Sequence, residues 1–418
     1  MSFKSIWSDT AAEGPALPSF SGSRKADVVV IGAGFQGLST ALHLAEAGTD
    51  VVVLEAETPG AGASGRNGGQ VIPGLKDDPD WLDRNWGPQA TEFAGSTADT
   101  LFDLIDRLGL ECEADRSGWI QAGNKAVHLK KLEDRMAQWQ ARGAPVSWLD
   151  AAAMARATGT SAFKGGWIDR RAGKVHPLKL VHGLTAAAQS AGAKVFARSP
   201  VVGLDRAAGS WTVRSTGGGT ISCDQVVLAS NMYTPAELRT DIVRATVGVH
   251  SFQVATQPLD QDQLARILPG GAVVSEVRRV GTYFRIGPQS RLMIGGRGSF
   301  SDPRRDSDFG RIENELTDLF GPGLEVAYRW FGRVGITPDH RIRLCNPEPG
   351  LILATGFNGR GVALSVALGK AMAAHLAHDA PMPVPMIDAI PTLPLRRLNA
   401  AVGTVGVAWY RLLDYLDR

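Results

Sequence analysis

Residues 27–37 read Asp-Val-Val-Val-Ile-Gly-Ala-Gly-Phe-Gln-Gly. The apolar run before the first glycine predicts a buried strand, and the periodic apolar residues after the last one predict a helix that ends at Gly48. Gly32 suits a tight turn, Gly34 allows close approach of a pyrophosphate, and Gly37 lets the helix pack on the strand. The helix N-terminus offers N–H groups to the phosphates. The stretch therefore predicts a dinucleotide-binding unit.

A second apolar run, residues 51–54, ends at Glu55. The run predicts the second strand of a βαβ unit, and the carboxylate at its end can accept hydrogen bonds from a ribose. The elements follow in the order strand, turn, helix, strand and acid. This order favours dinucleotide binding over a glycine-rich turn in an ordinary α/β domain.

Two further segments suggest which dinucleotide is bound. Residues 60–70, Gly-Ala-Gly-Ala-Ser-Gly-Arg-Asn-Gly-Gly-Gln, carry five glycines and let the backbone approach a flat ligand. Residues 351–354 predict another apolar strand, followed by Thr-Gly-Phe-Asn-Gly-Arg-Gly and a helix to about residue 377. Short strands of period two lie between them, from about 195 to 296. A nucleotide fold split in this way suits FAD better than NAD, whose site is usually completed within contiguous βαβ units.

We therefore expect an α/β (α+β) fold with a split Rossmann-type FAD-binding domain, glutathione-reductase-like, and an inserted β-rich substrate domain. The expected parts are a leader at 1–26, a discontinuous FAD-binding domain at 27–75, 150–235 and 335–380, a substrate domain at 76–149 and 236–334, and a proline-rich linker with a C-terminal helix at 381–418.

The bulk properties exclude several classes of protein. The 418 residues carry a net charge of +2, which gives no reason to expect nucleic acid as a partner. The three cysteines are far apart and match neither a metal site nor a disulfide framework. With no secretory signal and no apolar run of membrane-spanning length, a cytoplasmic location is expected. Residues 398–416 predict an apolar helix, for which docking on the protein is favoured over peripheral membrane contact.

The motifs resemble the glycine/D-amino-acid oxidase superfamily of flavoproteins. The resemblance rests on residues 32–42 and 62–70, on Ala-Thr-Gln-Pro-Leu at 255–259, on Thr-Pro-Asp at 337–339 and on Thr-Gly-Phe-Asn-Gly-Arg-Gly at 355–361. Within it, the chain is most similar to the γ-glutamylputrescine oxidase-like branch, which shares the N-terminal Trp segment and the Arg-Asn-Gly-Gly loop. The resemblance covers about residues 5–410.

The resemblance implies FAD as cofactor. Carried over, Gly32, Gly34 and Gly37 hold the pyrophosphate and Glu55 holds the adenosine ribose. The remaining FAD-contacting positions that it implies lie beside these motifs, along the flavin or at its pyrimidine edge: Phe35, Gln36, Ala56, Ser64, Gly65, Arg66, Asn67, Gly68, Gly69, Gln70, Val201, Ala229, Gly332, Gly356, Asn358, Gly359, Arg360, Gly361 and Val362. For Arg360 the alternative is a solvated arginine at a helix start.

The chain differs from the sarcosine oxidase relatives at three positions, and these differences bear on how FAD is attached and on which substrate is oxidised. Gly332 stands where those relatives carry the cysteine that binds flavin covalently, so noncovalent FAD is expected. Ala363 replaces a lysine that holds the substrate carboxylate, and Met293 replaces a lysine associated with oxygen activation. These changes weaken the case for an N-methylglycine substrate and for a fast reaction with oxygen.

Candidate substrate-side residues come from strand alternation. Tyr283 and Arg285 are expected on one face of a strand, and Met293 and Arg297 on one face of the next. If these faces look at the flavin, Tyr283 positions the amine and an arginine pairs with a substrate carboxylate. Arg333 flanks the missing cysteine position and is a further candidate. For each arginine the alternative is a surface ion pair.

No residue is predicted as a catalytic acid or base. His250, on a strand, is expected to be packed or hydrogen-bonded, and His176, before Pro177, is expected to enter a helix. An amine needs only to lose its proton before hydride passes to flavin N5, and the resulting imine hydrolyses in water.

The predicted function is FAD-dependent oxidation of a C–N bond in an amine or amino acid, most simply a γ-glutamylated amine. A secondary or cyclic amino acid is the alternative substrate. A flavin-binding subunit without turnover and an NAD-dependent dehydrogenase are the alternatives from other classes. Oxygen or an electron-transfer acceptor would reoxidise the flavin.

Overall fold

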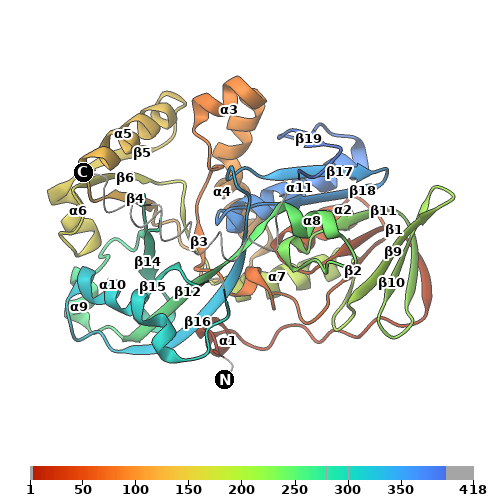
Figure 1. The fold of residues 1–418 in the computed structure, drawn as a ribbon, viewed down its shortest axis with the longest axis horizontal. Helices are drawn as coiled ribbons and strands as arrows, with labels where there is room; N and C mark the ends of the chain where they lie inside the picture. Colours follow the sequence, from red (N-terminus) through yellow and green to blue (C-terminus); the bar gives the residue numbers. More distant parts are fainter. Residues whose placement is uncertain (1–2, 279, 300, 392–418) are drawn as a thin grey trace.

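The computed structural model describes residues 3–278, 280–299 and 301–391 (Figure 1). The C-terminal helix predicted at 398–416 lies outside the described residues. Among those described, the strands form two large sheets and one small one. Within the same residues, no helix is both long and apolar enough to cross a membrane.

The first sheet carries the dinucleotide unit and has nine strands among the described residues. Its central strands are parallel: β1 pairs with both β2 and β11, and β11 pairs with β18. Their valines and leucines are buried on both faces, as expected where helices cover a parallel sheet. The strands of this sheet are β19 (Met386–Ile387), β17 (Arg343–Glu348), β18 (Leu351–Thr355), β11 (Thr220–Leu228), β1 (Ser23–Ile31), β2 (Val51–Leu54), β8 (Lys194–Phe196), β9 (Val201–Ala207) and β10 (Ser210–Ser215).

The predicted split of the nucleotide fold is confirmed. Strands from the two ends of the described chain lie in one sheet, with only β11 between β1 and β18 (Figure 1). The sequence pattern predicts two short strands, at 220–223 and 225–229. In the structure they form one continuous strand, β11, because Asp224 does not interrupt the ladder.

The second sheet is the β-rich insertion and has eight strands in the described part of the chain. Neighbouring strands are mostly antiparallel, and its inner residues form a separate apolar core. Its strands are β16 (Val326–Ile336), β12 (Val247–Pro258), β15 (Arg291–Arg297), β14 (Thr282–Ile286), β13 (Val273–Glu276), β4 (Trp119–Gly123), β6 (Gly165–Asp169) and β5 (Val146–Asp150). A small ribbon of β3 (Gln70–Val71) and β7 (Gly173–Lys174) lies between the two sheets (Figure 1).

Sheet membership suggests one change to the expected domain boundaries. Residues 150–235 are expected in the FAD-binding domain, but β6 pairs with β4 and β5 in the second sheet. A division that follows the sheets would therefore place the boundary near residue 172, after β6. The five residues of this strand, Gly-Gly-Trp-Ile-Asp, are too few to show a period.

The helices cover both sheets. Helical periodicity in the sequence predicts helices at about 35–47, 89–108, 125–142, 177–191 and 308–320, which are present with small shifts, whereas α1, α3, α6, α8 and α9 were not predicted. The helices are α1 (Ile6–Thr10), α2 (Phe35–Glu46), α3 (Pro79–Trp86), α4 (Pro88–Leu108), α5 (Ala126–Ala141), α6 (Ala151–Thr158), α7 (Pro177–Ser190), α8 (Thr240–Ala245), α9 (Gln261–Arg266), α10 (Gly310–Phe320) and α11 (Gly361–His378).

Two of these helices set the geometry of the nucleotide site. Helices α2 and α11 lie side by side, and a Cβ at Gly369 would come within 2.7 Å of the Gln36 carbonyl oxygen. Ser39 donates a hydrogen bond to the carbonyl of Val366 at 2.7 Å. The absence of a side chain at Gly369 therefore lets the two helices approach closely, with both N-termini at the same cavity.

Candidate active site

A cavity of about 370 Å³ runs between the first sheet and the loops that follow its strands. It extends from the end of β2, past the N-terminus of α2, to the N-terminus of α11. Predicted FAD-contacting residues on its wall are Gly32, Gly34, Phe35, Gln36, Glu55, Ala56, Ser64, Asn67, Val201, Ala229, Gly359, Gly361 and Val362. The cavity thus brings together residues from all three glycine-rich motifs.

The glycines keep this cavity open. Gly32 has a φ of 106°, a conformation that L side chains rarely adopt. A Cβ at Gly34 would lie 2.8 Å from the hydroxyl of Ser64, and a Cβ at Gly37 would overlap the carbonyl oxygen of Gly32. The Ser64 hydroxyl accepts a hydrogen bond from the N–H of Phe35 at 3.0 Å. This contact attaches the loop at 60–70 to the start of α2.

Glu55 is held in place by backbone N–H groups. One carboxylate oxygen accepts from Ala33 at 2.7 Å and the other from Glu57 at 3.0 Å. Burial raises the pKa of the Glu55 carboxyl group above its ordinary value. Each oxygen keeps a second lone pair for an outside donor such as a ribose hydroxyl. The glycine cradle, two helix N-termini and an oriented carboxylate on one cavity fit the phosphates and ribose of a dinucleotide.

The loop at 65–70 forms a rigid wall behind the cavity. The backbone carbonyl of Arg66 accepts from Gln253 at 2.9 Å and from the indole of Trp330 at 3.1 Å. The carbonyl of Asn67 accepts from the indole of Trp7 at 2.9 Å. The Asn67 side chain accepts from the N–H of Gly69 at 2.7 Å, which closes a tight turn. Three buried side chains from distant segments therefore fix a loop rich in glycine.

The side chains of the loop also point into the protein. Arg66 donates to the carbonyl of Phe331 at 2.7 Å and lies over its ring. Gln70 accepts from Ser275 at 3.0 Å and donates to the carbonyl of Val274 at 3.1 Å. These two residues, like Gly65, Gly68 and Gly69, lie outside the cavity lining. Their contacts in the structure support the loop.

Tyr283 and Arg285 share a strand face, as predicted. This face meets the loop at 65–70, which we name the flavin loop because the family resemblance places it along the flavin. The guanidinium of Arg285 is buried and donates to the carbonyls of Gly69 at 2.9 Å and Val175 at 2.8 Å. Burial lowers the pKa of Arg285 to about 10. The ring of Tyr283 packs beside Gly68, and its hydroxyl is hydrogen-bonded to Ser251. Arg285 thus holds the loop through its carbonyls, whereas Tyr283 lies directly against it.

Arg333, on β16, is also part of the cavity lining. It forms an ion pair with Asp302 at 2.6 Å, and Asp302 also accepts from His250 at 2.7 Å. The expectation that His250 is a hydrogen-bonded residue is confirmed. The neighbouring Gly332 faces the flavin loop, because a Cβ there would lie 3.5 Å from the Cβ of Arg66.

His176 is confirmed as a structural residue. Its Nδ1 accepts from the N–H of Lys179 at 3.2 Å and caps α7. The other ring nitrogen lies 3.0 Å from the hydroxyl of Thr10, so Nε2 carries the proton and donates. Burial lowers the pKa of His176 to about 4, and the ring stays neutral at physiological pH.

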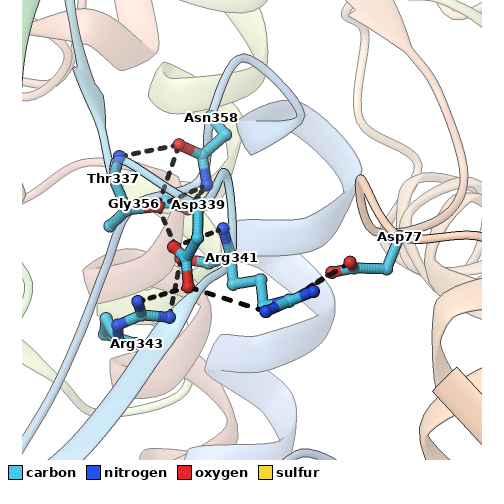
Figure 2. Close-up of polar contacts among 7 residues, drawn as sticks. All are labelled: Asp77, Thr337, Asp339, Arg341, Arg343, Gly356 and Asn358. Carbon is cyan, nitrogen blue, oxygen red and sulfur yellow. Dashed lines mark hydrogen bonds and ion pairs between the residues drawn. The ribbon is translucent and has the colours of Figure 1, made fainter. Parts of the chain in front are cut away.

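The loop before α11 is held by a polar network (Figure 2). The side-chain oxygen of Asn358 accepts from the N–H of Thr337 at 2.9 Å, and its nitrogen donates to the carbonyl of Gly356. Asn358 has a φ of 53°, in the left-handed region that asparagine tolerates. Asn358 and Gly356 therefore shape the loop rather than lining the cofactor cavity.

Arg360 is buried and directed away from solvent, contrary to the alternative of a solvated arginine. Its guanidinium donates to the carbonyl of Pro73 at 2.6 Å and lies over the ring of Trp119. Burial lowers the pKa of Arg360 to about 9. It occupies the N-cap of α11, next to residues that line the cofactor cavity.

A family model described as FAD dependent oxidoreductase, DAO, matches residues 27–375. The chain belongs to this DAO family. The match covers both sheets and every motif of the cavity, so FAD is the dinucleotide for which the cavity is built. The inference of FAD over NAD from the split fold is confirmed.

Two DAO-family relatives match almost the whole chain. A probable oxidoreductase OrdL of Rhizobium meliloti (strain 1021) is 30% identical over 97% of this chain and 96% of its own. The gamma-glutamylputrescine oxidoreductase of Escherichia coli (strain K12) is 29% identical over 93% of each chain. These relatives confirm the branch indicated by the sequence motifs.

Solved structures agree on the fold. Glycine oxidase from Geobacillus kaustophilus has a TM-score of 0.73 at 22% identity and covers 86% of this chain and 96% of its own. L-proline dehydrogenase from P. horikoshii has a TM-score of 0.74 at 19% identity and covers 88% of this chain and 96% of its own. The chain is thus an FAD-dependent oxidoreductase of amines or amino acids with a DAO-type fold.

Four residues that lie at or beside the site were not identified from the sequence. Trp7 and Gln253 hold the flavin loop, and Lys76 and His340 line a chamber beside Arg360. Trp7 entered the sequence analysis only as part of an N-terminal segment shared with the branch, although an isolated tryptophan in a polar segment is itself a signal of burial. Lys76 and His340 lie in loops without a motif, and only the fold brings them together.

Proposed function

We propose that this chain oxidises the C–N bond of a γ-glutamylated amine with noncovalently bound FAD. The observation that carries the proposal is the similarity to gamma-glutamylputrescine oxidoreductase, which extends over 93% of both chains. The noncovalent mode is supported by Gly332 at the predicted attachment position and by the burial of Cys112, Cys223 and Cys345 away from the cavity lining.

Bound FAD would accept a hydride from the carbon next to the substrate nitrogen. The residues of the chain bind and orient. Gly32, Gly34 and the N-terminus of α2 would hold the pyrophosphate, and Glu55 would accept from the ribose. The N-terminus of α11 presents partial positive charge at the other end of the cavity, where it would stabilise negative charge on a reduced ring.

Among the described residues, neither Tyr283 nor the histidines at 176 and 250 is a ready base. Burial raises the pKa of Tyr283 to about 12, so its hydroxyl stays protonated and can donate to or accept from a substrate amine without taking its proton. His250 is bound to Asp302 and His176 caps a helix. We therefore propose that Tyr283 orients the amine and that solvent takes its proton before oxidation.

An anaerobic bleaching experiment tests this function. The purified yellow protein is mixed under argon with γ-glutamylputrescine, putrescine, proline or pipecolate, and the absorbance near 450 nm is followed. We expect γ-glutamylputrescine to bleach the flavin, and air or a quinone added afterwards identifies the acceptor. Bleaching by the cyclic amino acids alone would redirect the substrate assignment. A yellow protein that no amine bleaches would indicate a flavin-binding subunit without turnover.

The binding mode of FAD has its own measurement. Acid precipitation should leave all the yellow colour in the supernatant, because no covalent bond retains it. Colour in the washed pellet would contradict noncovalent binding.

A further inference from the structure

Lys76 is a cation without a partner in the part of the chain that the structure describes. It follows β3 and lines a chamber together with Phe357, Asn358, Arg360 and His340. Its side chain is accessible, yet none of its interactions with described residues is a hydrogen bond or an ion pair. The side chain is exposed, but it lines the same chamber as the buried Arg360, next to the cofactor cavity.

The strongest electrostatic influences on Lys76 come from cations. Desolvation is the main cause that lowers the pKa of Lys76 to about 7, and Arg360, Arg135, Arg297 and Lys131 lower it further. The pKa of His340 is lowered by burial and then by Lys76 and Arg297. Lys76 therefore lines a chamber whose wall also carries Arg341 and Arg360, and further cations act on it from nearby.

The acidic groups nearby are already engaged by other cations. Asp77 accepts from Arg341 at 3.2 Å, and Asp339 pairs with Arg343 at 2.6 Å (Figure 2). Asp78 pairs with Arg135 at 2.5 Å. These ion pairs hold the two residues that follow Lys76 in place, since Arg341 joins residue 77 to the loop before β17. They do not neutralise Lys76 itself.

The Lys76 chamber adjoins the cofactor cavity. Phe357 lines both, and Arg360 stands at the N-terminus of α11, whose next two residues line the cofactor cavity. A cation cluster beside a reaction site lowers the free energy of a bound anion and raises that of a bound cation. The site is therefore suited to a substrate that carries a negative group some distance from its reacting amine.

We propose that Lys76 and Arg360 form an anion subsite that binds the carboxylate of the substrate, with Arg297 adding positive potential. This inference rests on the proposed function, because it assigns the part of the substrate that is not oxidised. It narrows the substrate class to amines that carry a carboxylate. A γ-glutamyl amine meets this requirement, whereas free putrescine and other polyamines do not.

The subsite makes anion binding dependent on pH. A carboxylate binds the protonated form of Lys76, whose pKa without ligand is about 7. Affinity should therefore be constant below pH 7 and fall as the pH rises above it. Asp77, Asp339 and Asp78 are engaged by Arg341, Arg343 and Arg135, so the change in affinity is assigned to Lys76.

The test measures binding to the FAD-loaded protein, without turnover. Glutarate, a dicarboxylate, and glutaramide, its uncharged diamide, are titrated by calorimetry between pH 6 and pH 9. The variants are Lys76→Met, Lys76→Arg and the matched control Lys194→Met, which removes an exposed lysine from β8.

We expect glutarate to bind the parent protein and the Lys194→Met control alike, with a Kd that rises above pH 7. Lys76→Met should weaken glutarate binding about tenfold or more and remove the pH dependence, because a charge-assisted hydrogen bond is lost. Lys76→Arg should restore most of the affinity and bind without a change near pH 7. Glutaramide should bind weakly to every form.

Two results would overturn the inference. One is equal glutarate affinity in the parent and Lys76→Met with the flavin content unchanged. The other is a Lys76→Arg protein that retains FAD and has no greater affinity than Lys76→Met. Failure of the proposed function looks different: glutarate then binds as expected, but no carboxylate-bearing amine bleaches the flavin.

Discussion

Replacement of Arg285 by methionine separates a structural role from a substrate-binding one. The side chain of methionine fits the buried stem of the arginine but removes every donor. The Arg285 guanidinium donates to the carbonyls of Gly69 at 2.9 Å and Val175 at 2.8 Å, and more weakly to Gly68 at 3.3 Å. The Gly69 carbonyl also accepts from the N–H of Val175 at 2.9 Å, so the change leaves one buried acceptor, the carbonyl of Val175, without a partner.

The magnitude follows from that one acceptor. A buried carbonyl without a donor costs about 1–3 kcal/mol. Relief from burying the guanidinium charge offsets part of this, which places the net effect near the lower end. At about 1.4 kcal/mol for each factor of ten, a loss of about 1 kcal/mol reduces the population of the native loop about fivefold.

The assay measures FAD affinity and substrate KM on the same protein. Arg285→Met should release FAD on dilution, bind added FAD about fivefold more weakly and unfold at a lower temperature. With saturating FAD, the KM for substrate should stay within about threefold of the parent value. Arg285→Lys should recover part of the FAD affinity, since an ammonium reaches fewer acceptors than a planar guanidinium.

The opposite pattern would refute this reasoning. If Arg285→Met keeps its FAD and its unfolding temperature while the KM for a carboxylate substrate rises tenfold, Arg285 binds substrate, as the sequence pattern suggested. The loop carbonyls would then not depend on it.

Three further predictions concern the cofactor cavity. Glu55→Gln should weaken FAD binding about tenfold. In the parent protein, FAD affinity should fall as acid protonates Glu55, at a higher pH than for an ordinary glutamate because burial raises its pKa. Equilibrium dialysis from pH 4 to 8 measures both effects, and identical profiles for the two proteins would contradict the role of Glu55. Gly37→Ala should yield a colourless protein, since its Cβ would overlap the carbonyl of Gly32; a normal 450 nm absorbance after purification would show that the helix can shift. Trp7→Leu should loosen the loop through loss of the 2.9 Å bond to the carbonyl of Asn67; faster amide hydrogen exchange at residues 66–69 is the expected readout, and unchanged exchange would assign Trp7 to packing alone.

The sequence determined the dinucleotide unit because that signal is local. Gly32, Gly34, Gly37 and Glu55 lie within one βαβ unit, and each is required by backbone geometry that the neighbouring residues set. The split of the fold was also readable, since the strand at 351–354 repeats the apolar pattern of a buried parallel strand. Strand alternation correctly placed Tyr283 and Arg285 on one face.

The tertiary structure decided what those faces touch. Arg285 reaches Val175, which is 110 residues away, and Trp7 reaches Asn67 across 60 residues. Alternation along a strand gives the direction of a side chain but not the segment packed against it. The arginine expected to meet a substrate therefore meets backbone carbonyls.

Lys76 shows the same limit. Its neighbours in sequence, Asp77 and Asp78, suggest a lysine in ordinary ion pairs. The fold instead pairs those acids with Arg341 and Arg135 and leaves the lysine among cations. The charge balance at this position depends on how the loops at 337–343 and 356–360 lie against residues 73–78. That arrangement comes from the docking of two sheets and from no local pattern.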